Sequence, residues 1–378
     1  MNWGVLYYAF AVLLLPVQRE LQLPPWAVTA AFSSALLMSA VLAPVMGRWN
    51  DRGHALRSIG TGGGAAAVLL LTWSLVPGVL AFYLVWIGLG ICMAAALYEP
   101  AFVLILRSHG STESRQRALA IVTIYGGLAS TVFLPGTQLL VSWGGWRVAV
   151  AVLAGLVAVS TMVTVLLVSR GGVEVPEPAA PALASRGVDN AASLEIQSLA
   201  FTFGLSTLAS AAFIANLVPA LGERGIAPET AAWAGGLFGL LQLPGRALMV
   251  NRRLSPAPGV LVLVSLAAQA LGLVVVAAVS PLWAIAIGVM TFALGAGLTA
   301  LARPSLVYSQ FGLHQSGYVN GRLARAQQFA RAVGPVAASA AATLTSHATV
   351  LVLLALVLAW LAWRFAINRR GRSPATAG

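Results

Sequence analysis

Continuous apolar runs of about 20 residues recur along the whole chain, and no other feature restricts its fold as strongly. An α-helix needs about 20 apolar residues to cross a bilayer, whereas the strands of a membrane β-barrel alternate apolar and polar side chains. Because the runs do not alternate, they predict an all-α polytopic membrane protein. We expect twelve spans, at residues 3–17, 27–46, 59–76, 79–106, 118–141, 148–168, 196–221, 230–250, 260–279, 282–311, 323–344 and 349–367.

The composition supports this interpretation. Of the 378 residues, 59% are hydrophobic and 8% are charged, which is more apolar surface than one soluble core could bury. The net charge of +12 comes from arginines in the short gaps between runs and forms no basic face, so we predict the lipid bilayer as a partner and no nucleic acid. Cys92 is the only cysteine, and the histidines form no cluster, so we expect no disulfide, metal or cofactor.

A polar, proline-rich segment separates two sets of six runs. We predict a six-helix bundle at 1–169, a cytoplasmic linker at 170–195, a second six-helix bundle at 196–368 and a cytoplasmic tail at 369–378. The two halves align at an offset of about 200 residues, which matches Pro16 with Pro219. Parallel repeats of this kind are related by a pseudo-twofold axis along the membrane normal.

The first run is short, which raises the alternative of a signal peptide. We reject it because the segment from Ala9 to Pro16 recurs downstream and no small-residue cleavage site follows. A start upstream of Met1, or a helix that continues past Pro16 toward Leu23, would explain the shortness. The arginines set the orientation: with a cytoplasmic N-terminus, fourteen lie on the inner side and three on the outer side. We therefore expect an inner (plasma) membrane protein with both termini cytoplasmic.

Two similar boxes place a charge beside a proline inside the apolar runs. Span four contains Glu99 and Pro100, and span ten contains Arg303 and Pro304. Ionisable side chains at membrane depth are costly and tend to face a cavity or a partner, so both are candidate site residues. Each proline removes a backbone donor and frees a carbonyl one turn earlier, so we expect a kink at Pro100 and at Pro304, with the carbonyls of Ala96 and Ala300 freed.

The roles of the two charges stay open at the sequence level. Glu99 and Arg303 form an ion pair in one interpretation; in another, Arg303 receives an anionic solute while Glu99 binds and releases a proton. These two interpretations are compatible, and a third places either residue in a loop. Further candidates for the solute or proton site are Tyr98, Asn216 and Tyr8, with Arg331 and Gln242 ranked lower; interhelical hydrogen bonds are the alternative for these polar groups.

The loop after span two reads Gly47-Arg48-Trp49-Asn50-Asp51-Arg52-Gly53, with Arg57 close behind. This loop resembles the G-x-x-x-D-R-x-G signature of the major facilitator superfamily, with one spacer missing before Gly53. Together with six plus six spans and an inner linker, the resemblance extends over nearly the whole chain. It implies the major facilitator fold, a cavity lined by spans one, four, seven and ten, and a conformational latch formed by Gly47, Asp51, Arg52 and Arg57. The alternative for this loop is a capped turn without a latch.

We therefore expect a secondary active transporter, functional as a monomer, that moves a small solute by alternating access. An organic or inorganic anion with proton coupling fits the charges best. Exporters of drug-like or toxic compounds are a less favoured alternative, because the arginine that such exporters carry four residues before a span-four glycine is Leu84 here, before Gly88. A receptor or scaffold on the same fold is a further alternative. The Gly145-Trp146-Arg147 turn resembles monocarboxylate-porter-like members. An intramembrane enzyme is not expected, because both aspartates lie in inner loops.

Overall fold

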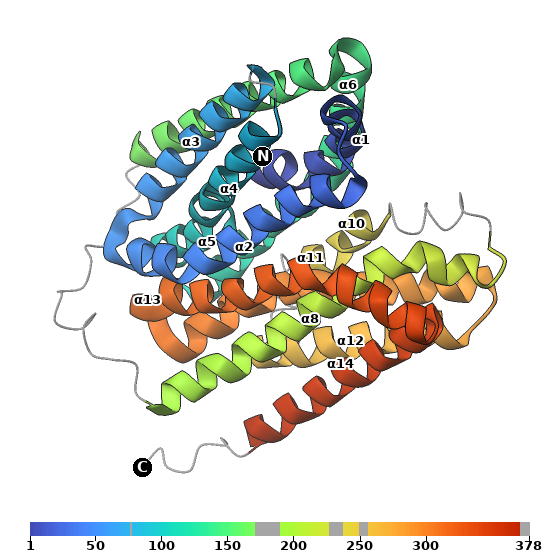
Figure 1. Ribbon diagram of the computed structural model, residues 1–378. Coiled ribbons are helices and arrows are strands. Elements are labelled where there is room, and N and C mark those ends of the chain that lie inside the picture. The colour runs from blue at the N-terminus through green and yellow to red at the C-terminus, as the bar shows by residue number, and fades with distance from the viewer. Residues whose placement is uncertain (76–77, 171–189, 227–236, 249–255, 371–378) are drawn as a thin grey trace. The chain divides into compact units, whose positions relative to one another are not determined.

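The structure, a computed structural model, describes residues 1–75, 78–170, 190–226, 237–248 and 256–370 (Figure 1). Within these ranges the chain forms helices and no strand, which confirms the predicted all-α class. The elements are η1 (Gly4–Tyr8), α1 (Ala9–Leu21), α2 (Pro25–Trp49), η2 (Asn50–His54), α3 (Ala55–Leu75), α4 (Val79–Ala96), α5 (Tyr98–Ser108), α6 (Thr112–Arg170), α8 (Asn190–Gly222), α10 (Phe238–Leu241), α11 (Leu243–Leu248), α12 (Pro258–Ala278), α13 (Leu282–Leu344) and α14 (His347–Arg370).

Eight helical stretches in the described ranges are long and apolar enough to cross a membrane. Two of them, Ala27–Leu75 and Thr112–Arg170, are about twice the length that a crossing needs, and each contains a glycine with left-handed backbone angles, Gly53 (φ 87°) and Gly145 (φ 77°). Each stretch therefore holds two spans joined at its glycine. Gly312 (φ 70°) interrupts α13 in the same way, and a further helical segment runs from there to Leu344. The expected span at 230–250 lies only partly within the described residues.

The first span extends beyond its short apolar run. A π-helical turn, η1, leads directly into α1, which passes through Pro16 and ends at Leu21. Gln22 then adopts a left-handed conformation (φ 52°) and terminates the helix. The expectation that the helix continues past Pro16 is confirmed.

The chain forms two compact units. Unit 1 comprises Met1–Ala200 and Val307–Phe329, and unit 2 comprises Phe201–Leu306 and Ala330–Gly378. This division differs from a cut at the polar linker, because the residues around Gly312 group with the first unit. The predicted bundle boundaries at 1–169 and 196–368 stay a prediction.

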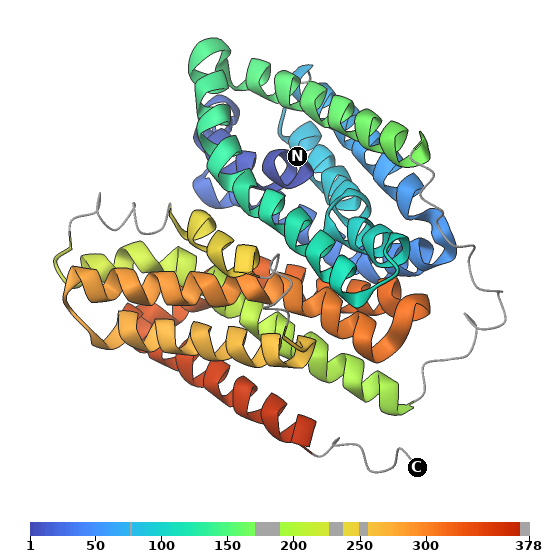
Figure 2. The same ribbon diagram turned by 180° about the vertical axis from the view of Figure 1, so that it is seen from behind.

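Unit 1 is built on close helix pairs. α3 packs along α6 and α4, and α2 packs against α4; Figures 1 and 2 both show α3 beside the C-terminal part of α6. Aromatic side chains fill the centre: the rings of Trp73 and Trp86 lie 5.6 Å apart, and the Phe10 ring lies 4.7 Å from that of Trp86. Lipid tails are as apolar as these side chains, so dense packing rather than removal from water holds such helices together.

Unit 2 combines small residues with a buried polar layer. A Cβ atom on Gly272 of α12 would lie 2.6 Å from the carbonyl oxygen of Gly288, so α12 and α13 approach backbone to backbone. The polar layer joins α8, α12 and α13: the Gln269 amide donates to Thr299 Oγ1 (3.0 Å) and accepts from Ser206 Oγ (3.1 Å). Gln269 is fully buried, and these hydrogen bonds satisfy it as an interhelical bridge rather than as a solute contact.

Candidate functional site

The first charged box lies at a complete break in span four. α4 ends at Ala96, Leu97 has non-helical backbone angles (φ −87°, ψ −139°), and α5 starts at Tyr98. Pro100 is therefore the third residue of a new helix, where a backbone N–H has no intrahelical partner, so the proline costs no hydrogen bond. The expected kink at Pro100 is corrected to a break, and half-buried Glu99 stands in the first turn after it.

The carbonyl of Ala96, which the sequence predicts to be freed, has a partner from the start of the chain. The Nδ2 group of Asn2 donates to this oxygen at 3.1 Å. Two groups 94 residues apart are thus joined at the break. The sequence offers no periodic signal for this role of Asn2, because it precedes the first apolar run.

Aromatic side chains surround the break. The ring of Tyr98 stacks on Phe102 (centroids 5.1 Å apart) and contacts Trp3 (5.0 Å). The Tyr98 hydroxyl lies directly over Gly126 of α6, where a Cβ atom would collide with it. Tyr8 lies in η1 with its ring edge-on to Tyr7 at 5.2 Å. The rings of Trp3 and Phe102 therefore lie against Tyr98, the residue that precedes Glu99.

The second box has a different backbone. α13 continues through Arg303 and Pro304 with helical angles, and its non-helical residue is Gly312, two turns later. The Arg303 side chain is buried, with 5% of its surface exposed, one turn after the polar layer at Thr299. Glu99 belongs to unit 1 and Arg303 to unit 2, so their direct pairing stays a prediction.

The remaining candidates in unit 2 lie in different settings. Asn216 of α8 is fully buried; its Nδ2 donates to the Ala212 carbonyl at 2.8 Å, while its Oδ1 has no hydrogen-bond partner among the described residues. Gln242 accepts a hydrogen bond from Arg246 at 2.6 Å. Arg331 is half-buried in α13. Asn216 is thus the one of these three with an unused buried acceptor.

The predicted latch loop forms a specific contact inside unit 1. Asp51 Oδ1 accepts from the backbone N–H of Gly317 at 2.7 Å, and Oδ2 accepts from that of Tyr318 at 2.6 Å. Gly47 lies against the carbonyl of Gly317, with no room for a Cβ atom. Arg107 donates to the backbone oxygen of Asp51. The carboxylate therefore bridges the end of α2 and the segment of α13 that follows Gly312.

Asp51 lies in the turn between two spans. Burial raises the pKa of its carboxyl group to about 7, although the N–H groups of Tyr318 and Gly317 and the charge of Arg107 act in the opposite direction. Arg52 and Arg57, which the resemblance places in the latch, have exposed side chains. The arginine that contacts Asp51 is Arg107, from the last turn of α5. The role of this contact as a latch stays a prediction.

Sequence reasoning misses two buried arginines, Arg246 in α11 and Arg115 in α6. Arg115, counted from the sequence among the inner-loop charges, is 9% exposed in the first turn of α6. Its Nε donates to the Leu106 carbonyl at 2.9 Å, and its guanidinium lies over the ring of Tyr308 (4.3 Å) and donates to the hydroxyl. The partner ring is 193 residues away, so no local pattern predicts this burial.

Comparison with known proteins decides the family. The sequence model of the Major Facilitator Superfamily matches residues 1–197, more than half of the chain. The chain belongs to the major facilitator superfamily. Members of this superfamily are membrane transporters.

A curated relative within the major facilitator superfamily is the MFS-type efflux pump of Mycolicibacterium smegmatis, 27% identical over 246 residues. The match covers 61% of this chain and 56% of the relative, so the chain spans about half the length of that protein.

Two solved structures of the superfamily show the same fold. The human organic anion transporter MFSD10 (TETRAN) is 16% identical, with a TM-score of 0.71, over 96% of this chain and 97% of that one. The Escherichia coli fucose:proton symporter FucP is 14% identical, with a TM-score of 0.71, over 99% of this chain and 96% of that one. At this identity the likeness establishes the major facilitator fold, which confirms the predicted fold class.

Proposed function

We propose that this protein moves a small anionic solute across the membrane by alternating access, coupled to protons through Glu99. The observation that carries the proposal is the buried guanidinium of Arg303 in a membrane-spanning helix, together with membership of a transporter family. A guanidinium is charged at all relevant pH values, and its burial at membrane depth is costly unless an anion or another partner balances it. An anionic solute group is a suitable partner during transport, because a guanidinium binds carboxylate and phosphate groups through two parallel hydrogen bonds. The same fold carries organic anions in the human transporter.

Glu99 suits the proton role because of where it lies. Broken spans whose half-helix ends meet the substrate path are typical of substrate and coupling-ion sites in secondary transporters. The α5 N-terminus stabilises a carboxylate in its first turn, and the half-buried side chain keeps access to exchange a proton. The fucose:proton symporter shows that this fold supports proton coupling. Pairing of Glu99 with Arg303 in part of the cycle is compatible with this role and couples the two charges.

The test is uptake of a panel of organic and inorganic anions into proteoliposomes with an imposed proton gradient. We expect Arg303→Gln to reduce anion uptake at least tenfold, and Glu99→Gln to abolish its dependence on the gradient while retaining solute exchange. Arg325→Gln, at an exposed position of the same helix, is the control and should leave uptake within twofold. Unchanged proton-driven uptake in Glu99→Gln would refute the coupling role, and unchanged anion uptake in Arg303→Gln would refute the anion site.

Export of drug-like compounds is the second candidate function. It is favoured by the likeness to the MFS-type efflux pump and by the half-exposed aromatic rings of Trp3, Tyr7 and Tyr98 near the break. Planar apolar compounds pack well on such rings. Energised cells that express the protein should then accumulate less of a fluorescent lipophilic dye than control cells. Equal accumulation would leave the anion proposal as the better one.

The proposal includes an inner-membrane location, cytoplasmic termini, a monomer as the functional unit, and a latch at Asp51. The arginine distribution supports the orientation. A cysteine placed after Arg372 in a chain whose Cys92 is replaced should be labelled by an impermeant maleimide in inside-out vesicles and protected in intact cells. Labelling in intact cells would place the C-terminus outside the cell and contradict the proposed orientation.

A further inference from the structure

Two carboxylates follow the same pattern in the two halves of the sequence. Glu20 lies at the end of α1, and Glu223 directly follows α8. The residues are 203 positions apart, the same offset that aligns Pro16 with Pro219. Each carboxylate meets a cationic or titratable side chain at the start of the last span of its half, but the two partners differ in chemistry.

In unit 1 the partner is Arg147, which follows the turn at Gly145. Its guanidinium forms an ion pair with Glu20, and it also donates to the carbonyl of Ser74 near the end of α3 at 2.9 Å. The indole N–H of Trp146 donates to the other oxygen of Glu20 at 2.6 Å. One permanent cation thus neutralises the carboxylate and caps α3 at the same time.

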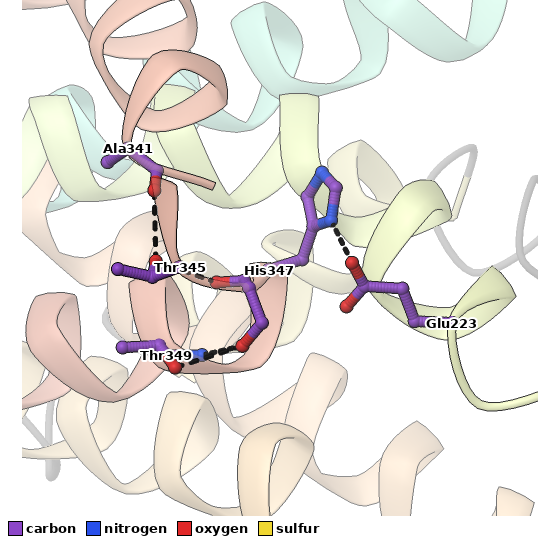
Figure 3. A network of polar contacts seen from close by, with 6 residues as sticks. Glu223, Ala341, Thr345, His347 and Thr349 are labelled. Carbon is purple, nitrogen blue, oxygen red and sulfur yellow. Dashed lines mark hydrogen bonds and ion pairs between the residues drawn. The ribbon is translucent and has the colours of Figure 1, made fainter. Parts of the chain in front are cut away.

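In unit 2, different side chains cap the helix and contact the carboxylate. Arg224 caps α12 by donating to the carbonyls of Val276 (2.5 Å) and Ala277 (2.6 Å). The carboxylate of Glu223 instead contacts His347 (Figure 3). The distance between His347 Nδ1 and Glu223 Oε1 is 2.6 Å. Because Arg224 already satisfies the end of α12, the contact between Glu223 and His347 is not needed to cap that helix.

The position of His347 is fixed by its surroundings. It is the first residue of α14, and the Ser346 hydroxyl caps this helix by accepting the N–H of Thr349 at 3.1 Å. Thr345 bonds back to the Ala341 carbonyl at 2.9 Å, which holds the preceding turn (Figure 3). A helix N-terminus is unfavourable for a positive charge, so the protonated imidazole depends on the Glu223 carboxylate.

Few other charges act on this histidine. Glu223 and Arg224 are the charged groups at this end of α8, and α12 contains none. α13 contributes none after Arg331, and α14 none between His347 and Arg364, more than four turns away. Among the described residues, Glu223 is thus the carboxylate that contacts His347.

We propose that Glu223 and His347 form a proton-binding clasp that joins the ends of α8 and α14 more tightly as the pH falls below neutrality. Histidine side chains ordinarily titrate near pH 6.5, so acid converts a neutral hydrogen bond into a charged one. The Arg147 pair stays charged throughout and is the built-in control. The two pairs are matched in exposure, with 23% and 44% for His347 and Glu223 against 32% and 40% for Arg147 and Glu20. The arginine distribution assigns the ends of α8 and α14 that carry Glu223 and His347 to the outer face, so the pH outside the cell would control this contact.

The experiment compares apparent melting temperatures of the purified full-length protein in detergent at pH 5.5 and pH 8. We expect His347→Gln to lower the melting temperature by about 1–2 °C at pH 5.5 and by much less at pH 8. Glu223→Gln should give the same pattern, and adding it to His347→Gln should have no further effect. His347→Arg should make the contact independent of pH. Arg147→Gln and Glu20→Gln should lower the melting temperature equally at both pH values.

A loss in His347→Gln that is equal at both pH values, or a pH-dependent loss of the same size in Arg147→Gln, would overturn the proposal. The comparison requires no transported solute, so its result is independent of whether the proposed function holds. Failure of anion uptake therefore counts against that function alone.

Discussion

The strength of the contact between α2 and the segment of α13 after Gly312 can be tested by adding one methyl group at Gly317. In Gly317→Ala, the added Cβ would lie 2.6 Å from the carbonyl oxygen of Gly47 and 2.5 Å from Asp51 Oδ1, whereas ordinary contacts begin at 3.4 Å. The first of these neighbours is backbone, which cannot rotate away. The two segments must therefore separate by roughly 0.8 Å, or the methyl must be accommodated by strain.

The cost follows from the same geometry. Forced overpacking of this kind costs about 1–3 kcal/mol. The separation also lengthens the hydrogen bonds from the N–H groups of Gly317 and Tyr318 to Asp51, and a bond to a charged group contributes about 1.5–3 kcal/mol. Because a small shift weakens these bonds without removing them, we expect the free energy needed to open the contact to fall by about 2–4 kcal/mol. That change corresponds to roughly 30- to 700-fold in the opening equilibrium.

Labelling of a buried cysteine measures this equilibrium. Ser316 is fully buried beside the contact, so Ser316→Cys, in a chain with Cys92→Ala, reports each opening by its rate of reaction with a maleimide. We expect Gly317→Ala to raise this rate by one to three orders of magnitude. Gly64→Ala is the control, since a Cβ atom there meets nothing within 4 Å in α3. Equal labelling rates in the two variants would show that the close approach does not hold the segments together.

Three further outcomes are expected. Asn2→Ala removes the hydrogen bond to the Ala96 carbonyl and should lower the free energy of unfolding by about 1 kcal/mol, measured as a lower melting temperature. Arg115→Lys keeps the charge but loses the bonds of a buried guanidinium, so it should destabilise by about 2 kcal/mol, while Arg117→Lys at an exposed site should be neutral in the same assay. Since the pKa of Asp51 is raised from 3.8 to about 7 by burial, the arrangement that buries it binds the proton more tightly. Maleimide labelling slows in acid in every variant because the thiolate is the reacting form. Lowering the pH from about 7 toward 4 should therefore slow labelling of the Ser316→Cys reporter more than it slows labelling of the same reporter with Asp51→Asn.

The spans were predictable because their cause is local. Length and apolarity of each run determine a crossing helix, and this rule located the described spans as well as the turn that contains Gly53. The continuation of α1 through Pro16 also follows from sequence, because a crossing requires more residues than the short run provides. The loop that carries Asp51 was located by its resemblance to a family signature.

What was not predictable depends on groups far apart in the chain. The burial of Arg115 requires the ring of Tyr308, and the contact of Asp51 requires the backbone of Gly317, a residue with no apolar or charged signature of its own. A charged residue counted in a loop is assigned to solvent by any rule based on composition. The division of the chain between the two units is non-local for the same reason, since it depends on where the residues around Gly312 pack.

The two charged boxes show why a repeated pattern gives different backbones. A helix N-terminus stabilises a negative side chain and opposes a positive one. Glu99 therefore favours a new helix that starts beside it, and the break at Leu97 is completed by Asn2, which satisfies the carbonyl of Ala96. Arg303 at the same place in a broken helix would be destabilised, and α13 keeps it inside a continuous helix through Pro304. The sign of the charge, rather than the proline common to both boxes, thus accounts for which span breaks.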